Sequence, residues 1–151
     1  MRYFFVTVAI VLMDQVTKHE VRENLSVGKS IDIIGDVFEV THVVNKGGAW
    51  GMLSGFTYPL AAFSAAVSIG IIVFLVLSKS LAPASKWALT LIVAGGIGNL
   101  TDRLLFGHVT DMFSFSFFSP VFNFADISIT CGCILMIFNI VRDGRSIGQK
   151  S

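Results

Sequence analysis

Long apolar runs dominate the pattern of this sequence, and short polar stretches separate them. A helix needs about 20 mostly apolar residues to cross the hydrocarbon layer of a membrane. Four runs predict such spans, although the first is marginal because Asp14 and Lys18 end its apolar part. We therefore expect a mainly α-helical membrane protein with four transmembrane helices, over approximately residues 3–18, 58–77, 87–105 and 121–141.

The segments between the first two spans and before the last one predict a small β-sheet. SIDIIGDVFEV alternates apolar and polar residues around Gly35, which suits a turn. HVTDMFSFSFF also alternates, and this places Asp111 on the same face as Phe113 and Phe115. We expect a sheet region at approximately residues 20–56 and 108–119, with a short helix or loop on the same outer surface.

The composition agrees with a single integral membrane domain over residues 1–151. Hydrophobic residues make up 54% of the chain and charged residues 14%, whereas a globular domain has about 25% charged residues. A formal net charge of +1 offers no basic surface for phosphates, so nucleic acid is a poor partner.

Basic residues indicate how the spans are oriented. In the short loops of one side stand Arg2, Lys79, Lys86, Arg142, Arg145 and Lys150, and on the other side stand Arg22, Lys29 and Lys46. The positive-inside rule then predicts that both termini are cytoplasmic.

With this topology, the polar groups recognised within the spans converge near the outer leaflet. They are Asp14, Lys18, Asn99, Arg103, Asn123 and Asp126. Ionisable groups inside a membrane are costly and indicate a functional site. For any single residue, the alternative is a charge that marks the end of a helix at the interface.

Helical spacing predicts which of these residues support one another. Asp14 and Lys18 are four apart, as are Asn99 and Arg103, so each pair shares a helix face. We interpret these four as buried supporting residues. Asp102 cannot share a face with both Asn99 and Arg103, which leaves an exposed charge at the helix end as the alternative for it.

Two further aspartates, Asp111 and Asp126, lie among phenylalanines and suit acid–base chemistry. Two facing carboxyl groups hold one proton between them, so that one can deprotonate water while the other donates to a carbonyl oxygen. A chain that doubles back at Pro120, at the entry to the fourth helix, would bring them together.

Other catalytic classes lack their motifs. The sequence contains no HExxH zinc motif and no G-x-S-x-G serine motif. The glycines of AGGIGNLTDR lie inside a predicted span, where close helix packing explains them better than a dinucleotide site. A small proton-linked transporter or channel subunit, with the same aspartates passing protons, is the alternative to an enzyme.

Five motifs resemble the lipoprotein signal peptidases (signal peptidase II) of bacterial inner membranes. They are DQVTK at 14–18, NKGGAWG at 45–51, GGIGNLTDR at 95–103, VTDMF at 109–113 and FNFADISI at 122–129, in the family's order along nearly the whole chain. Gly48 and Trp50 depart from the usual alanine and phenylalanine, which puts substrate and inhibitor preference in question.

The resemblance implies a membrane aspartic protease that cuts diacylglyceryl-modified prolipoproteins just before the lipidated cysteine. It implies Asp111 and Asp126 as the catalytic dyad near the outer leaflet, without a metal or organic cofactor. Substrate-binding or supporting roles are implied for Asp14, Lys18, Asn45, Gly51, Asn99, Arg103 and Asn123. Membrane lipid is an expected partner, cyclic peptides such as globomycin are expected inhibitors, and we expect a monomer.

Overall fold

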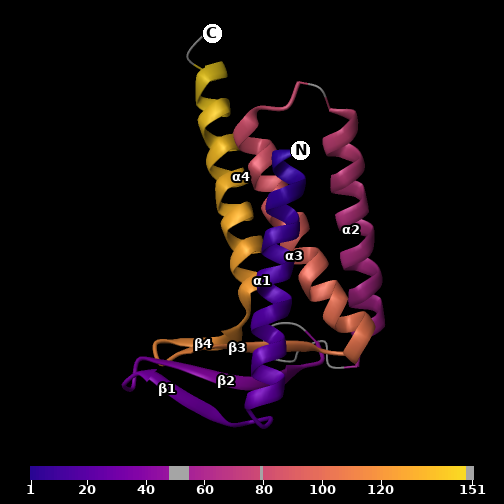
Figure 1. Cartoon of the computed structure of the whole chain (residues 1–151). Coiled ribbons are helices and arrows are strands. Elements are labelled where there is room, and N and C mark those ends of the chain that lie inside the picture. The colour runs from indigo at the N-terminus through magenta and orange to yellow at the C-terminus, as the bar shows by residue number, and fades with distance from the viewer. Residues whose placement is uncertain (48–54, 79, 149–151) are drawn as a thin grey trace.

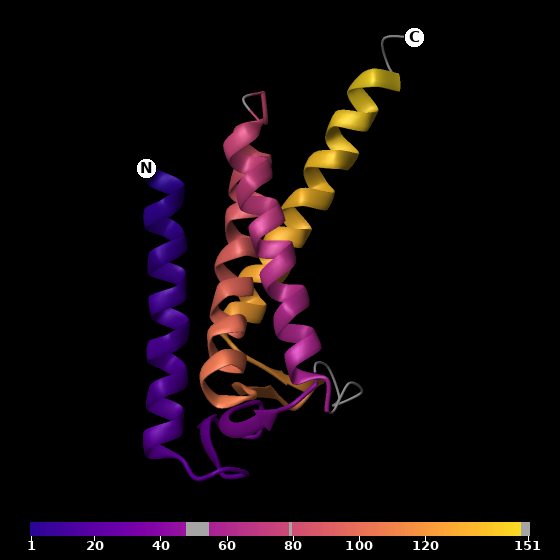
Figure 2. The ribbon, with the colours of Figure 1, turned by 90° about the vertical axis from the view of Figure 1, so that its right-hand side faces the viewer.

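The computed structural model of the chain describes residues 1–47, 55–78 and 80–148. In this part of the chain, four helices stand side by side and a four-stranded sheet lies across one end of them, opposite both termini (Figures 1 and 2). The elements are α1 Arg2–Asn24, β1 Ser30–Ile34, β2 Phe38–Asn45, α2 Thr57–Leu77, α3 Pro83–Phe106, β3 Val109–Phe115, β4 Phe118–Phe122 and α4 Phe124–Gly148.

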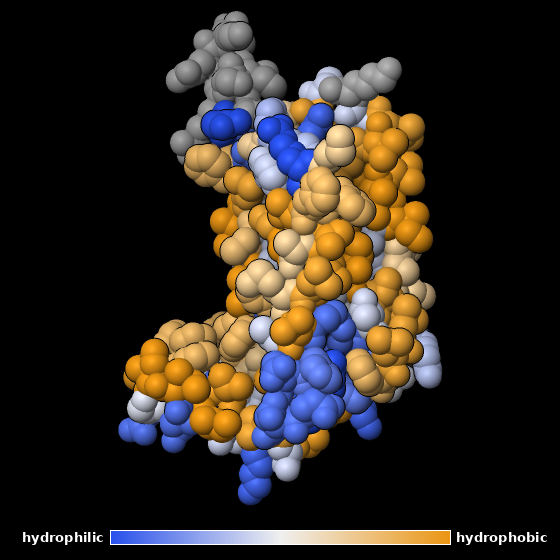
Figure 3. Space-filling view, viewed as in Figure 1, coloured by the Kyte–Doolittle hydropathy of each residue, from blue (hydrophilic) through white to orange (hydrophobic). Residues whose placement is uncertain are grey.

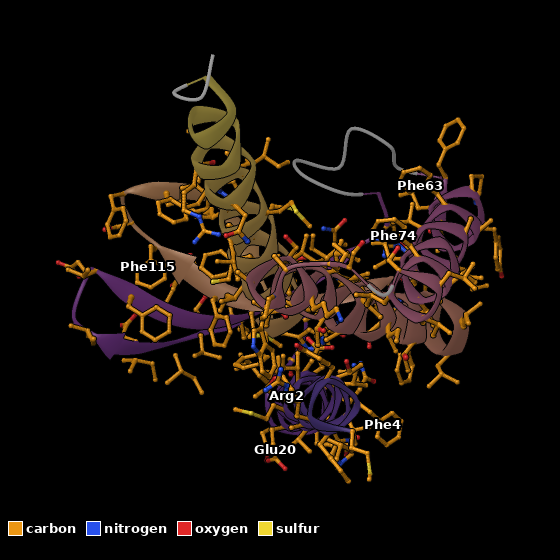
Figure 4. The ribbon with its side chains drawn as sticks, turned by 90° about the horizontal axis from the view of Figure 1, so that it is seen from above. Arg2, Phe4, Glu20, Phe63, Phe74 and Phe115 are labelled. Carbon is orange, nitrogen blue, oxygen red and sulfur yellow. The ribbon has the colours of Figure 1, made fainter. Side chains whose placement is uncertain are left out.

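Three of the described helices are long and apolar enough to cross a membrane: α2, α3 and the Phe124–Arg142 part of α4. The 21 residues of α2 span about 30 Å, the thickness of the hydrocarbon layer. Phe63 is 68% exposed on the outer side of α2 (Figure 4). On the face shown in Figure 3, hydrophobic residues cover the middle of the helices, and hydrophilic residues gather near both ends. The chain is therefore a mainly helical membrane protein.

The first helix differs from the other three. It begins at Arg2 and continues to Asn24, beyond the predicted end at residue 18. It is not among the three apolar spans, and its buried residues include Asp14 and Lys18. Its outer side is nevertheless apolar from Phe4 to Val16, with Phe4 67% exposed and pointing away from the bundle (Figure 4).

Three glycines let α3 pack closely against the other helices. A Cβ atom on Gly95 would overlap the backbone at the start of α4, and one on Gly96 would lie 2.8 Å from Ser68 Oγ of α2. A Cβ atom on Gly98 would meet the carboxylate of Asp14 on α1. Each glycine therefore admits a different neighbour, which confirms close helix packing as the role of the AGGIGNLTDR run.

The sheet is antiparallel throughout, with strand order β1-β2-β3-β4. The predicted strands and the turn at Gly35 are confirmed, and the φ angle of +44° at Gly35 suits a residue without Cβ. The ring of Phe115 stacks on that of Phe38 at 4.7 Å and on that of Phe122 at 6.0 Å. The alternating phenylalanines thus give the sheet an aromatic face.

The predicted start of the fourth span was wrong. Pro120 is not at a helix entry but within β4, where Phe118 pairs with Phe115 and Phe122 pairs with Phe113. The chain reverses before Phe118 rather than at Pro120. Because β4 is the edge strand, a residue without an N–H group is tolerated there. Residues 48–54, part of the predicted sheet region, lie outside the described residues, and the short outer helix or loop stays a prediction.

Candidate active site

Strand β3 and helix α4 bring Asp111 and Asp126 to one cavity of about 550 Å³. Asp126 lies in the first turn of α4 rather than deeper in the helix, because residues predicted as helix form β4 instead. Further polar side chains in the cavity wall are Asn45, Asn99 and Arg103, and the apolar part of the wall includes Val109, Phe118, Pro120, Val121, Phe122 and Ile127.

Asn123 connects the two carboxyl groups. Its Nδ2 donates to Asp111 Oδ1 at 2.6 Å, while its Oδ1 accepts the backbone N–H of Asp126 at 3.0 Å. The backbone N–H of Asn123 donates in turn to Asp126 Oδ2 at 3.3 Å. This reciprocal pattern is that of a capping box, in which two otherwise unpaired N–H groups at a helix start are satisfied. The cap of α4 therefore includes Asp126, which lines the cavity.

Each carboxyl group also receives a second side-chain amide. Asn45 Nδ2 on β2 donates to Asp111 Oδ2 at 2.8 Å. Asn99 Nδ2 on α3 donates to Asp126 Oδ1 at 2.7 Å. The hydrogen-bond partners of both carboxyl groups are thus neutral amides from different elements.

Burial changes the acidity of Asp111, which is only 2% exposed. Removal from water raises its pKa to about 6, the hydrogen bond from Asn45 opposes this rise, and the charge of Asp126 adds to it. A neutral carboxyl group therefore persists at Asp111 to a higher pH than usual for aspartate.

A second group of charges, buried except for part of Arg22, lies beside the cavity, between α1 and α3. The Lys18 ammonium contacts Asp14 Oδ2 at 2.9 Å and Asp102 Oδ2 at 3.5 Å, and Arg22 contacts Asp102 Oδ1 at 3.6 Å. Two cations thus balance two carboxylates, which makes burial of the charges tolerable. The predicted pairing of Asp14 with Lys18 is confirmed.

Lys18 also links these charges to the cavity. Its Nζ donates to Asn99 Oδ1 at 2.9 Å, which leaves the Asn99 amide nitrogen to donate to Asp126. A rotated Asn99 amide would place an NH₂ group against the ammonium. Lys18 therefore fixes the orientation of the Asn99 amide in which its nitrogen donates to Asp126.

The two aspartates of this group hold the elements that carry Asp111 and Asp126. Asp14 Oδ1 accepts the backbone N–H of Ala125 at the start of α4, at 2.9 Å. Asp102 Oδ2 accepts the backbone N–H of Thr110 at the start of β3, at 2.9 Å. A carboxylate at a helix start is also favoured by the helix dipole.

The alternative of an exposed Asp102 was wrong. Its side chain is fully buried, because its partners lie on α1 and β3 rather than on its own helix. Arg22, assigned to an outer loop, belongs to α1, where it also donates to Thr110 Oγ1 at 3.1 Å. Its spacing of four residues from Lys18 could have revealed this.

Arg103 and Gln15 also contact the polar groups of α3 and α1. Arg103 lines the cavity, and its NH1 donates to the Asn99 carbonyl at 3.3 Å, as its helical spacing suggested. Gln15 was missed, although its Nε2 donates to Asp14 Oδ2, to the Gly98 carbonyl and to Asp102 Oδ1. Gly51, like Gly48 and Trp50, lies outside the described residues.

One polar group does not follow the predicted convergence. Asn139 is 2% exposed in the part of α4 far from the sheet, and its amide nitrogen has no hydrogen-bond partner among the described residues. No described contact explains its position. Over the same residues, no cluster of histidine, cysteine, aspartate or glutamate is placed to hold a metal ion.

Known proteins resemble this chain over most of its length. A family model described as signal peptidase (SPase) II matches residues 6–142. A lipoprotein signal peptidase of Brevibacillus brevis is 34% identical over 146 residues, which cover 96% of this chain and 98% of the relative. One of Clostridium acetobutylicum is 35% identical over 144 residues, which cover 92% and 94%.

Two solved structures, each described as a bacterial membrane enzyme, share the fold. One matches with a TM-score of 0.89 and 32% identity, over 95% of this chain and 89% of its own. The other matches with a TM-score of 0.85 and 31% identity, over 94% of both chains.

Replacement of Lys18 by methionine tests the buried group of charges. The variant keeps an apolar stem of similar length but leaves Asp14 and Asp102 without their shared cation. We expect the free energy of unfolding to fall by about 3–5 kcal/mol, measured by denaturant titration in detergent micelles. Lys29→Met, at an exposed position, is the matched control. Equal stability of the two variants would contradict the role given to Lys18.

Proposed function

The chain belongs to the signal peptidase II family of aspartic peptidases, which remove signal peptides from prolipoproteins, and we propose that Asp111 and Asp126 carry out this reaction. One observation carries the assignment: the two carboxyl groups line the same cavity and are connected through Asn123. Family membership sets aside the transporter alternative.

The surroundings of the other two buried aspartates support this choice. Asp14 and Asp102 pair with Lys18 and Arg22 and accept backbone N–H groups, so their oxygens are occupied. Neither lines the cavity. They act as structural residues, and only the other pair is placed to meet a substrate.

The reaction follows from one proton shared by two facing carboxyl groups. The ionised group takes a proton from water, whose oxygen attacks the carbonyl carbon of the scissile bond. The protonated group donates to the carbonyl oxygen, which gives a neutral tetrahedral intermediate. When the C–N bond breaks, the leaving nitrogen takes a proton from the group that had deprotonated water. The other group, now ionised, takes one hydroxyl proton of the intermediate, so the signal peptide leaves as a carboxylic acid and the dyad again holds one proton.

Asn45, Asn99 and Asn123 orient the dyad, since their amides hold the carboxyl groups in place. Arg103, in the cavity wall, adds positive charge beside the two aspartates. This is a supporting role, because its guanidinium is also held by the backbone of α3.

We further propose that α1 is a fourth transmembrane helix and that the sheet lies on the outer side of the bacterial inner membrane. The apolar outer side of α1 supports this, because its buried charges face α3. Both termini lie at the end of the bundle opposite the sheet (Figure 1). With the excess of basic residues near that end, the termini are cytoplasmic.

The position of the cavity explains a requirement for a lipidated substrate. The dyad lies where the sheet meets the apolar helices, so a scissile bond must be held at the same depth. Two acyl chains anchor a peptide to a membrane stably, whereas one chain does not. A diacylglyceryl group on the cysteine after the cut supplies that anchor.

Replacement of Asp111 or Asp126 by asparagine tests the dyad. Each variant keeps the size of the side chain but cannot exchange the catalytic proton, so cleavage of a lipidated preprotein should fall by at least about 10²–10⁴-fold. The rate is measured with purified enzyme, and globomycin serves as a second way to stop it. Asp36→Asn, at an exposed position near the sheet turn, should cleave normally. Cleavage by either dyad variant at the normal rate would remove the assignment.

The pH profile tests the shared proton. Because the pKa of Asp111 is raised to about 6, kcat/KM should fall as the pH rises past about 6 and the pair loses its proton. The amide of Asn45 lowers this pKa, so Asn45→Ala should raise it and move the alkaline fall to higher pH. A variant that loses rate equally at every pH would contradict this role of Asn45.

A preprotein with and without the diacylglyceryl group tests the selection by depth. In lipid vesicles we expect kcat/KM to fall by more than about tenfold for the unmodified preprotein, since no acyl chains hold its cysteine at the depth of the dyad. Both forms carry the same sequence, so peptide contacts are matched. Equal rates would show that membrane depth does not select the substrate.

A further inference from the structure

The cavity extends beyond the dyad along one face of α4. This helix contributes Asp126, Ile127, Thr130 and Cys131 to the wall. Residues four positions apart lie on the same side of a helix, about one turn away, and Thr130 follows Asp126 by four residues as Cys131 follows Ile127. Thr130 and Cys131 are thus about 6–7.5 Å further along the helix axis than Asp126.

The substrate runs in the same direction. The signal peptide precedes the scissile bond and lies in the membrane, and α4 enters the membrane from its sheet end. Residues before the bond therefore pass from the dyad along α4. An extended chain advances about 3.3 Å per residue, so Thr130 and Cys131 lie level with the second or third residue before the cut.

We propose that Thr130 and Cys131 form the wall that selects the size of the substrate side chain two or three positions before the scissile bond. This rests on the proposed dyad, which fixes where the bond lies. Both side chains are small and exposed, so they leave room beside the dyad. Phe118 and Val121 of the sheet region also line the cavity, so the space admits an apolar side chain.

A second cysteine on the same helix offers a matched control. Cys133 is also exposed, but it follows Cys131 by two residues and points to a different side of the helix. It does not line the cavity. The same substitution at both positions therefore separates an effect on the cavity from a general effect on α4.

Substrate pairs with leucine or alanine at one position test the proposal. For wild type, Cys131→Phe and Cys133→Phe, kcat/KM is measured with the exchange made at the first, second, third or fifth residue before the cut. We expect Cys131→Phe to lower kcat/KM at least tenfold for leucine and less than threefold for alanine, at the second or third position only. Thr130→Leu should shift the preference in the same direction, and Cys133→Phe should leave it unchanged.

Two results would overturn the proposal: an unchanged leucine-to-alanine ratio in Cys131→Phe and Thr130→Leu, or an equal shift in Cys133→Phe. Failure of the dyad assignment gives a different result, because Asp111→Asn or Asp126→Asn would then retain cleavage whatever the preference at this wall.

Discussion

The ammonium group of Lys18 is the interaction on which the rest of the structure depends. It has three N–H donors, and the structure provides three acceptors, one each from Asp14, Asp102 and Asn99. A buried cation is stable only when its donors are satisfied and its charge is balanced, and both conditions are met here. Because the acceptors lie on α1 and α3, this single group joins the first helix to the centre of the bundle and also sets the amide of Asn99 toward Asp126.

The four buried or nearly buried aspartates fall into two pairs that differ in their hydrogen-bond and ion-pair partners. Asp14 and Asp102 have cations as partners and hold the starts of α4 and β3 through backbone N–H groups. Asp111 and Asp126, on those same two elements, receive only neutral amides from side chains. The first pair therefore holds the framework through ion pairs and backbone hydrogen bonds. The second pair lines the cavity and forms no ion pair within the described residues, which suits the proton exchange proposed for it.

Sequence patterns predicted the parts of this arrangement that depend on one element at a time. Spacing of four residues identified the Asp14–Lys18 pair, and alternation identified β3 with Asp111 on its aromatic face. The same reasoning failed for Asp102, because spacing along one helix does not predict partners on other elements. The partners of Asp102 lie on α1 and β3. The prediction at Pro120 failed because proline is tolerated both at a helix start and in an edge strand. Only the pairing of Phe118 with Phe115 shows that Pro120 lies in a strand. The family resemblance, in contrast, located Asn45, whose bond to Asp111 no local pattern predicts.

Asn123 explains why the geometry of the dyad is tied to the fold itself. It is the single residue between the end of β4 and the start of α4, so no flexible linker separates the sheet from the helix. The side chain that caps α4 also donates to Asp111, and the carboxyl group that completes the cap belongs to Asp126. An N-cap is worth about 1 kcal/mol to a helix, and here the same bonds align two carboxyl groups. Helix α4 therefore cannot start at another residue without separating Asp126 from Asp111, so the folding of the β4–α4 junction and the assembly of the proposed active site are one event.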